Sequence, residues 1–311
     1  MKKNEYIILL VAIAILSAYL LLNKRGSVNY SMPVLSKVDR DSISKLVIKK
    51  GSAKVTLTKN DSKWTITEDG SNAEKAPVDQ MLKAIDELNL TSLVSESENY
   101  AVYDLDEKNG IEVKVLDASD KVIRRMVIGK AATSFGQTLV TVGDDDKVYH
   151  AKGNIRNLFD KSVPTLRDKS VMTFSEDISE ITLHDGTKDV VIMRAPAEPS
   201  QEGDDEKKET EVKWQTKDGE PVKKTDIDDI INTLKNLRCD KYVEGKRKTD
   251  LKDSTYSITL KGNKSYTITL FAKDGSLHQA TSSESNFAFL LADHKANKIK
   301  KDLSAITETK E

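Results

Sequence analysis

The stretch "KAPVDQMLKAIDELNLTSLV", residues 75–94, decides how the chain is organised, because residues 224–243, "KTDIDDIINTLKNLRCDKYV", repeat its apolar pattern. Six apolar residues of the first stretch have an apolar counterpart 149 positions later. The pairs are Val78 and Ile227, Met81 and Ile230, Leu82 and Ile231, Ile85 and Leu234, Leu88 and Leu237, and Val94 and Val243. Apolar spacings of three and four residues predict an amphipathic helix in each stretch, followed by a strand.

The polar positions of the two stretches differ. Lys83 is matched by Asn232, and Asp86 is matched by Lys235. Shared packing preserves an apolar stripe, whereas catalysis requires particular polar residues. The repeat therefore predicts a duplicated scaffold rather than a repeated active site.

Alternating apolar runs on both sides of each helix extend the repeat. The matching strand candidates are 43–50 and 178–185, and hairpins are predicted at 111–117 with 122–129 and at 256–262 with 265–272. Short helices are predicted near 153–160 and 293–302. We therefore expect an α+β fold with two tandem copies of a β-rich unit, 42–170 and 171–304. Each unit has antiparallel strands, one packed amphipathic helix and a short second helix.

The remaining segments are short or polar. Residues 1–5 and 305–311 are predicted tails, 23–41 a linker, and 196–211 an exposed acidic loop present only in the second copy. In that copy Thr225-Asp226 is predicted to cap the helix, and in the first copy Pro77 suits the first turn.

Residues 6–22, "YIILLVAIAILSAYLLL", carry no charge. As a helix they would be about 25 Å long, at the short end of what spans a bilayer. A cleaved signal peptide is the alternative, but the small residues Ala12 and Ala14 lie inside the apolar run instead of after it. We expect an uncleaved transmembrane anchor that binds the lipid bilayer.

The side of the membrane on which the soluble part lies has to be inferred from charge and cysteine content. Lys24 and Arg25 after the span favour a cytoplasmic C-terminal part, although long domains translocate largely regardless of charge. A single cysteine, Cys239, in 311 residues suits a compartment without a reducing buffer. We expect the soluble part on the external face of the cytoplasmic membrane, periplasmic or extracellular.

Composition and motifs argue against several kinds of site. The chain has 49 Lys and Arg residues against 50 Asp and Glu residues, so it lacks the electrostatic footprint of a nucleic-acid-binding protein. One cysteine and four scattered histidines give no metal-ligand spacing, and no nucleophile has a recognisable partner pattern. We expect no catalytic, cofactor or metal site.

Trp64 in "KWTIT" and Trp214 in "KWQTK" occupy equivalent places before the two helices. Their rings could stack on sugars and are the candidate binding residues. Equivalent positions in a repeat favour core anchors instead.

These motifs together resemble the domain of unknown function 4340 family. The resemblance covers roughly 43–300 and is carried by "KWTIT", the helix "PVDQMLKAIDEL", Tyr103-Asp104-Leu105 before "IEVKVLD", "VIGKAATSFGQTLVTVGDDDKVYHA" and "VPTLRDKSVMTFSEDISEITL". Asp104 departs from the family, which usually has Gly there. The family is described as an auxiliary component encoded beside gliding-motility-type ABC transporters, and it brings no assigned catalytic residues.

Two functions are therefore expected. The first is a non-catalytic, membrane-anchored accessory protein of an ABC-type transport or cell-envelope assembly system, with a permease or other envelope proteins as partners. The alternative is a free-standing, membrane-anchored module that binds a cell-wall glycan or peptide.

Overall fold

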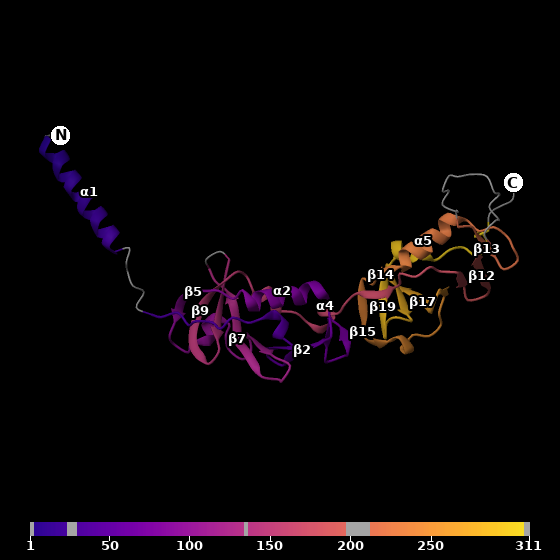
Figure 1. The fold of residues 1–311 in the computed structure, drawn as a ribbon, viewed down its shortest axis with the longest axis horizontal. Coiled ribbons are helices and arrows are strands. Elements are labelled where there is room, and N and C mark those ends of the chain that lie inside the picture. Colours follow the sequence, from indigo (N-terminus) through magenta and orange to yellow (C-terminus); the bar gives the residue numbers. More distant parts are fainter. Residues whose placement is uncertain (1–2, 24–29, 134–135, 197–211, 308–311) are drawn as a thin grey trace, which may run out of the picture. The chain divides into compact units, whose positions relative to one another are not determined.

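The structure, a computed structural model, describes residues 3–23, 30–133, 136–196 and 212–307, without the side chains of 3–8 and 20–23. The chain divides into two compact units (Figure 1). The first contains residues up to Glu68 together with Ala76–Lys161, and the second contains Asp69–Lys75 and the residues from Ser162 onward. The fold is α+β with antiparallel sheets, as predicted.

The first sheet has the order β4-β3-β2-β1-β6-β7-β8-β9-β5. Its strands are β1 (Lys45–Lys50), β2 (Ala53–Asn60), β3 (Lys63–Ile66), β4 (Ser71–Asn72), β5 (Leu90–Ser95), β6 (Ile111–Leu116), β7 (Val122–Ala131), β8 (Gln137–Val142) and β9 (Asp145–Lys152). The helices are α2 (Lys75–Asp86) and α3 (Arg156–Phe159), with 3₁₀ turns η1 (Arg40–Ser42) and η2 (Tyr100–Tyr103). The predicted hairpin of 111–117 and 122–129 is the β6–β7 pair.

The second sheet has the order β13-β12-β11-β16-β17-β18-β19-β15. Its strands are β11 (Glu180–His184), β12 (Asp189–Arg194), β13 (Trp214–Thr216), β15 (Lys241–Arg247), β16 (Tyr256–Lys261), β17 (Ser265–Asp274), β18 (Leu277–Ser282) and β19 (Phe287–Ala292); β10 (Ser170–Thr173) and β14 (Asn236–Arg238) form a separate pair. The helices are α4 (Val163–Leu166), α5 (Lys224–Leu234) and α6 (Asp293–Ile299), with η3 at Lys248–Asp250.

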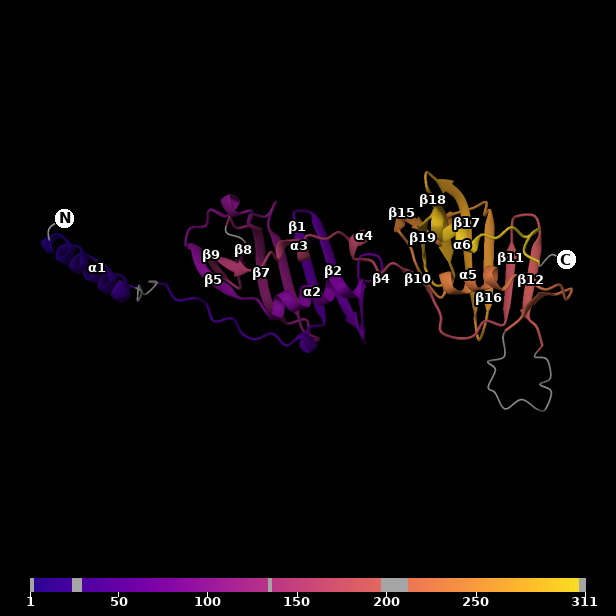
Figure 2. The same cartoon turned by 90° about the horizontal axis from the view of Figure 1, so that it is seen from above.

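The two sheets share one strand order. When β1, β2 and β3 are matched to β11, β12 and β13, and β5 to β9 are matched to β15 to β19, the neighbours agree throughout, and only the short edge strand β4 has no counterpart in the second sheet. In the first unit β5, the strand after α2, lies at the sheet edge beside β9, and in the second unit β15, which follows α5 and the short strand β14, lies at the edge beside β19. Figure 2 shows each sheet with its long helix lying across the strands.

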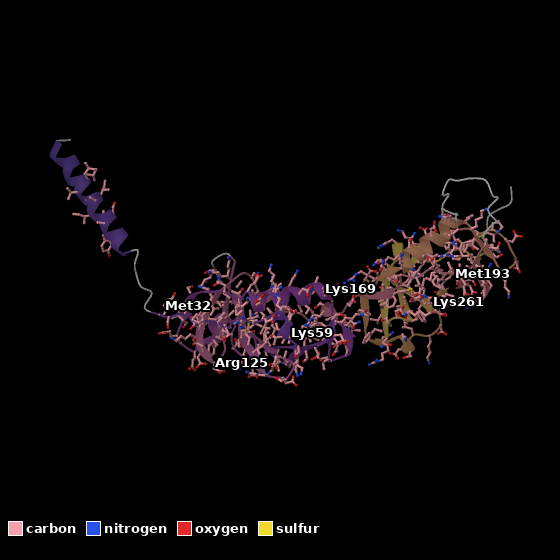
Figure 3. The ribbon with its side chains drawn as sticks, in the orientation of Figure 1. Met32, Lys59, Arg125, Lys169, Met193 and Lys261 are labelled. Carbon is pink, nitrogen blue, oxygen red and sulfur yellow. The ribbon has the colours of Figure 1, made fainter. Side chains whose placement is uncertain are left out.

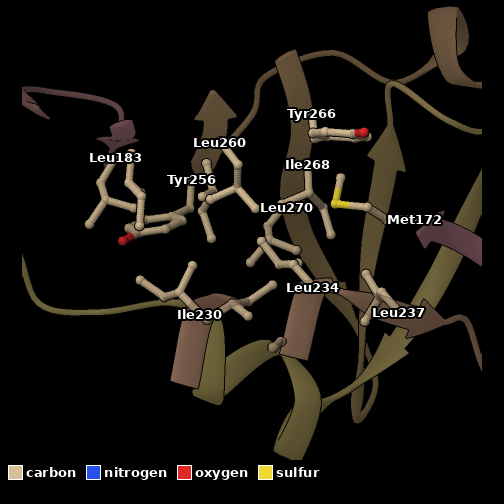
Figure 4. Packing of buried hydrophobic residues seen from close by; sticks show 14 of the residues in the cluster. Met172, Leu183, Ile230, Leu234, Leu237, Tyr256, Leu260, Tyr266, Ile268 and Leu270 are labelled. Carbon is tan, nitrogen blue, oxygen red and sulfur yellow. The ribbon is translucent and has the colours of Figure 1, made fainter. Parts of the chain in front are cut away.

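The apolar stripe of each long helix is buried as its spacing predicts. Val78, Met81, Leu82 and Ile85 are buried in α2, and Ile227, Ile230 and Leu234 are buried in α5. In the second unit, Ile230 and Leu234 point toward Tyr256, Leu260 and Leu270 of the sheet (Figure 4). Full burial of such a side chain is worth about 1.5–3 kcal/mol, so these stripes hold the helices on the sheets.

The predicted cap of the second helix is wrong. α5 begins at Lys224, so Thr225 and Asp226 lie inside its first turn. The N-cap residue is Lys223, and its side chain makes no capping hydrogen bond. Asp226 instead forms an ion pair with Lys301, with 3.0 Å between Oδ1 and Nζ. A carboxylate in the first turn also suits the positive end of the helix dipole. Pro77 lies in the first turn of α2, as expected.

The predicted anchor, 6–22, lies within the helix α1 (Lys3–Asn23). Within this run, the structure describes the side chains of residues 9–19 and leaves out those of 6–8 and 20–22. Among the described residues, no helix is long and apolar enough to cross a membrane. The structure thus confirms the helical backbone of this segment.

The unit boundaries differ from the repeat boundaries read from the sequence. The second unit begins at Ser162 and not at 171, and it includes Asp69–Lys75, which the sequence pattern placed in the first copy. The predicted acidic loop, 196–211, lies outside the described residues except for Pro196. Most of the predicted tail 305–311 also lies outside them, but Ile306 is buried in the second core.

The predicted linker, 23–41, is in part a structured segment of the first unit. Val38 is buried, and η1 begins at Arg40. Arg40 forms an ion pair with Asp86 at the end of α2, with 3.1 Å between Nε and Oδ2. Residues 24–29 lie outside the described residues.

Candidate functional site

The candidate binding residues Trp64 and Trp214 are both in the core. Trp64 is 9% exposed on β3 and Trp214 is 5% exposed on β13. Trp214 also lies under the guanidinium of Arg194, 5.6 Å from the ring centroid. Neither ring offers an open face to a sugar, so the interpretation of these two residues as core anchors is the one that the burial supports.

Polar side chains cover the outside of both units, as Arg125 on β7 and Lys261 on β16 illustrate (Figure 3). Several of them form ion pairs, such as Arg125 with Glu112 (2.9 Å between Nε and Oε1) and Lys261 with Glu180 (3.6 Å between Nζ and Oε2). Such pairs contribute at most about 1 kcal/mol each. These pairs each join one cation to one anion, in keeping with the balanced charge of the chain.

One histidine that the sequence did not single out is buried. His278 on β18 is 5% exposed, and its Nε2 lies 3.0 Å from Oδ1 of Asp293. The two atoms are close but do not meet hydrogen-bond geometry with each other. Lys273 also contacts Asp293, at 2.9 Å. The group is a polar cluster at the start of α6 in which His278 is buried, while the side chains of Lys273 and Asp293 are 51% and 40% exposed.

Burial lowers the pKa of the His278 imidazole, and the charges of Lys273 and Lys300 lower it further, against the opposing effect of Asp293. Protonation of His278 therefore favours the unfolded state, and stability present above the ordinary pKa of about 6.5 is lost as the pH falls. We expect the free energy of unfolding to decrease between pH 7 and pH 5.5. The His278→Gln variant should lose this dependence in urea titrations; an unchanged dependence would contradict the assignment.

A second polar cluster lies in the second unit around Arg167. Its guanidinium stacks 4.5 Å from the ring centroid of Phe287 and 5.4 Å from that of Tyr242, and its Nε donates to Asp69 at 2.7 Å. Burial raises the pKa of the Asp69 carboxyl, but hydrogen bonds from Ser71 and the contact with Arg167 outweigh burial and lower it. An adjacent pocket of about 130 Å³ is small and polar. Every charged group here is already paired, which favours a structural role.

A groove of about 440 Å³ lies in the first unit, between α2 and α3. Its floor is apolar and is formed by Ala84, Leu88, Ile155 and Leu158. Its polar lining residues are Gln80, Lys83, Glu87, Asn89 and Lys152. An apolar floor with a few polar groups at its rim is typical of a binding site.

Two other features carry no site. The carboxylates of the turn between β8 and β9 are used locally, since Asp145 accepts from Tyr149 at 2.6 Å and from the Lys147 backbone. Cys239 is 3% exposed, and burial raises the pKa of its thiol to about 11, so it is a packed side chain and not a reactive one. Within the described ranges, no group of His, Cys, Asp and Glu side chains could hold a metal ion.

The comparisons with known proteins identify the family. A family model described as "Domain of unknown function (DUF4340)" matches residues 64–257, which is more than half of the chain. The chain belongs to the DUF4340 family. This match runs from Trp64 in the first sheet to β16 in the second, so it includes both long helices. A search of curated proteins and a search of solved structures each gave no match.

The fold explains one departure from the DUF4340 pattern. Asp104, where the family usually has Gly, ends η2 with φ +55, in the left-handed region. Gly adopts this conformation freely, and Asp is among the few other residues that tolerate it. The turn places Leu105 against Gly129, where an added Cβ would lie 2.3 Å from the Tyr103 carbonyl oxygen. Gly129 is therefore required for packing, since a side chain there would collide with the Tyr103 carbonyl and Leu105.

Proposed function

We propose that this DUF4340 protein is a non-catalytic, membrane-anchored accessory protein of an ABC-type transport or cell-envelope assembly system. Residues 6–22 would hold it in the cytoplasmic membrane, with both units on the external face. The observation that carries the proposal is the uncharged apolar run 6–22 joined to two units whose repeated residues are the buried apolar ones. Such a chain offers surfaces, at a membrane, for other proteins to contact.

The family resemblance supports the transporter assignment, since it associates this domain with auxiliary components of ABC transporters. The open groove in the first unit supports a role in binding, because an apolar floor left uncovered favours a partner. Burial of Trp64 and Trp214 gives no support to a sugar-binding role based on their rings.

Affinity purification of the tagged full-length chain from detergent-solubilised membranes tests this function. We expect a permease or an ATPase subunit to be enriched, and a variant that lacks residues 1–25 to lose both the membrane fraction and this enrichment. Reproducible absence of any transporter or envelope-assembly subunit would contradict the proposal. Protease treatment of intact spheroplasts tests the topology separately: a protected C-terminal part would place the units inside the cell.

A further inference from the structure

The part of the first-unit groove around Leu88 has a covered counterpart in the second unit. By the offset of 149 residues, residues 87–89 correspond to Asn236–Arg238, which form β14. β14 pairs with β10, where Met172 lies opposite Leu237, the counterpart of Leu88. Met172 and Leu237 are 1% and 2% exposed, whereas Leu88 is half-buried and lines the groove. A strand in the place of β10 is therefore what this part of the groove lacks.

The chain that precedes β1 corresponds to β10, which precedes β11. Both segments end in a buried apolar residue, Val38 before β1 and Phe174 before β11. When these two residues are matched, residues 34–37 correspond to Ser170–Thr173, which form β10. Residues 34–37 belong to no strand, and neither do residues 87–89. The first unit thus contains both partners of a β10–β14 pair, but they are unpaired.

The segment before β1 is already held close to these partners at one end. In the second unit, Phe174 packs on Tyr266, with 5.1 Å between the ring centroids. Tyr266 lies opposite the fifth residue of β16, and Arg124 lies opposite the fifth residue of β6, so the two positions are equivalent. Arg124 donates to the carbonyl oxygen of Ser36 and to that of Ile85, in the last turn of α2. It therefore ties residue 36 close to the end of α2, just before residues 87–89.

We propose that residues 34–37 are a strap that pairs in antiparallel fashion with residues 87–89 and closes the groove at Leu88, as β10 does on β14. The structure shows the strap open. The register of β10 on β14 sets the opposed pairs of the closed strap, which are Lys37 with Glu87, Ser36 with Leu88, and Val34 with Asn89. A closed strap covers Leu88 and so competes with any ligand of the groove. The device does not depend on the accessory role.

The residues of the strap favour closing. Val34 is 97% exposed in the open state, and pairing covers part of its side chain. Lys37 and Glu87 carry opposite charges at opposed positions, which stabilises an antiparallel pair. The present contacts of Glu87 are long and exposed, at 3.5 Å from Arg40 and 4.0 Å from Lys83. Exchanging such contacts costs little, because exposed ion pairs contribute little to stability.

Disulfide trapping in the purified full-length chain in detergent tests the strap. The Val34→Cys, Asn89→Cys pair is at an opposed position, where antiparallel strands bring the Cα atoms within the range that a disulfide spans. The control pair, Val34→Cys with Lys83→Cys, uses the same strap residue and another exposed residue of the groove. The native Cys239 stays in place, since it is buried. With diamide, and with free thiols counted by a maleimide after unfolding, we expect the first pair to form a disulfide about tenfold faster than the control.

The charge pair provides a second readout. In the Val34→Cys, Asn89→Cys chain, Lys37→Glu should slow disulfide formation about threefold, and adding Glu87→Lys should restore the rate. All substituted residues are exposed, so the fold is kept. Equal rates for the matched and control pairs, or no disulfide between residues 34 and 89, would overturn the proposal. Failure of Glu87→Lys to restore the rate would refute the register and with it the likeness to β10.

Discussion

Replacing Ile230 by alanine is expected to destabilise the second unit by about 2–5 kcal/mol, since it leaves a cavity between α5 and the sheet. Ile230 is 0% exposed and faces Tyr256 and Leu260 (Figure 4). The matched change Met81→Ala, at the equivalent and equally buried position of α2, should destabilise the first unit by a similar amount. These are the positions that the repeat preserves, so the stability of each unit should depend on them.

The chain contains two tryptophans, one in each unit, which makes the two effects separately measurable. With Trp64→Phe, the fluorescence of Trp214 reports on the second unit, and with Trp214→Phe, Trp64 reports on the first. In urea, Ile230→Ala should lower the midpoint reported by Trp214 by about 1–2 M. Asn232→Ala, at an exposed position of the same helix, should change stability by no more than about 0.5 kcal/mol. Equal shifts for the two variants would contradict the assigned packing.

The sequence was sufficient for the local features of the fold. Spacings of three and four residues located both long helices, and alternation located the hairpins, because these patterns reflect which side of a helix or strand is buried. The same reasoning indicated core positions for the tryptophans. The predicted cap at Thr225-Asp226 was wrong because α5 begins at Lys224, and Lys301, 75 residues further along the chain, pairs with the Asp226 carboxylate.

The order of the strands in the sheets could not be predicted from the sequence because it depends on pairing between strands that are far apart in the chain. β5 pairs with β9 and β15 pairs with β19, although β6 and β16 are the next strands along the chain. The open groove was equally hidden, since it follows from the different lengths of α3 and α6 once they are folded. The buried position of Arg124 on β7, in contrast, could have been predicted from the sequence. In "VIRRMVIG" it lies in phase with Met126 and Ile128, and this alternation places it on the buried face.

Arg124→Ala is expected to destabilise the first unit by about 3 kcal/mol. The Arg124 residue is 8% exposed, and its guanidinium donates to the carbonyl oxygens of Ile85, in the last turn of α2, and of Ser36. A cation at the C-terminus of a helix is favoured by the helix dipole, and a hydrogen bond from a charged group is worth about 1.5–3 kcal/mol. Alanine removes both donors and leaves a buried carbonyl oxygen of α2 without a partner.

The neighbouring Arg125 provides the control, because its side chain lies on the opposite face of β7, is 47% exposed and pairs with Glu112. Arg125→Ala should cost less than about 1 kcal/mol in urea unfolding followed by Trp64 fluorescence. Arg124→Ala should also release the segment before β1 and so speed tryptic cleavage after Lys37 and Arg40, since loss of the contact with Ser36 favours local opening. If the Arg124→Ala and Arg125→Ala variants are equally stable and equally resistant to trypsin, Arg124 does not join this segment to α2.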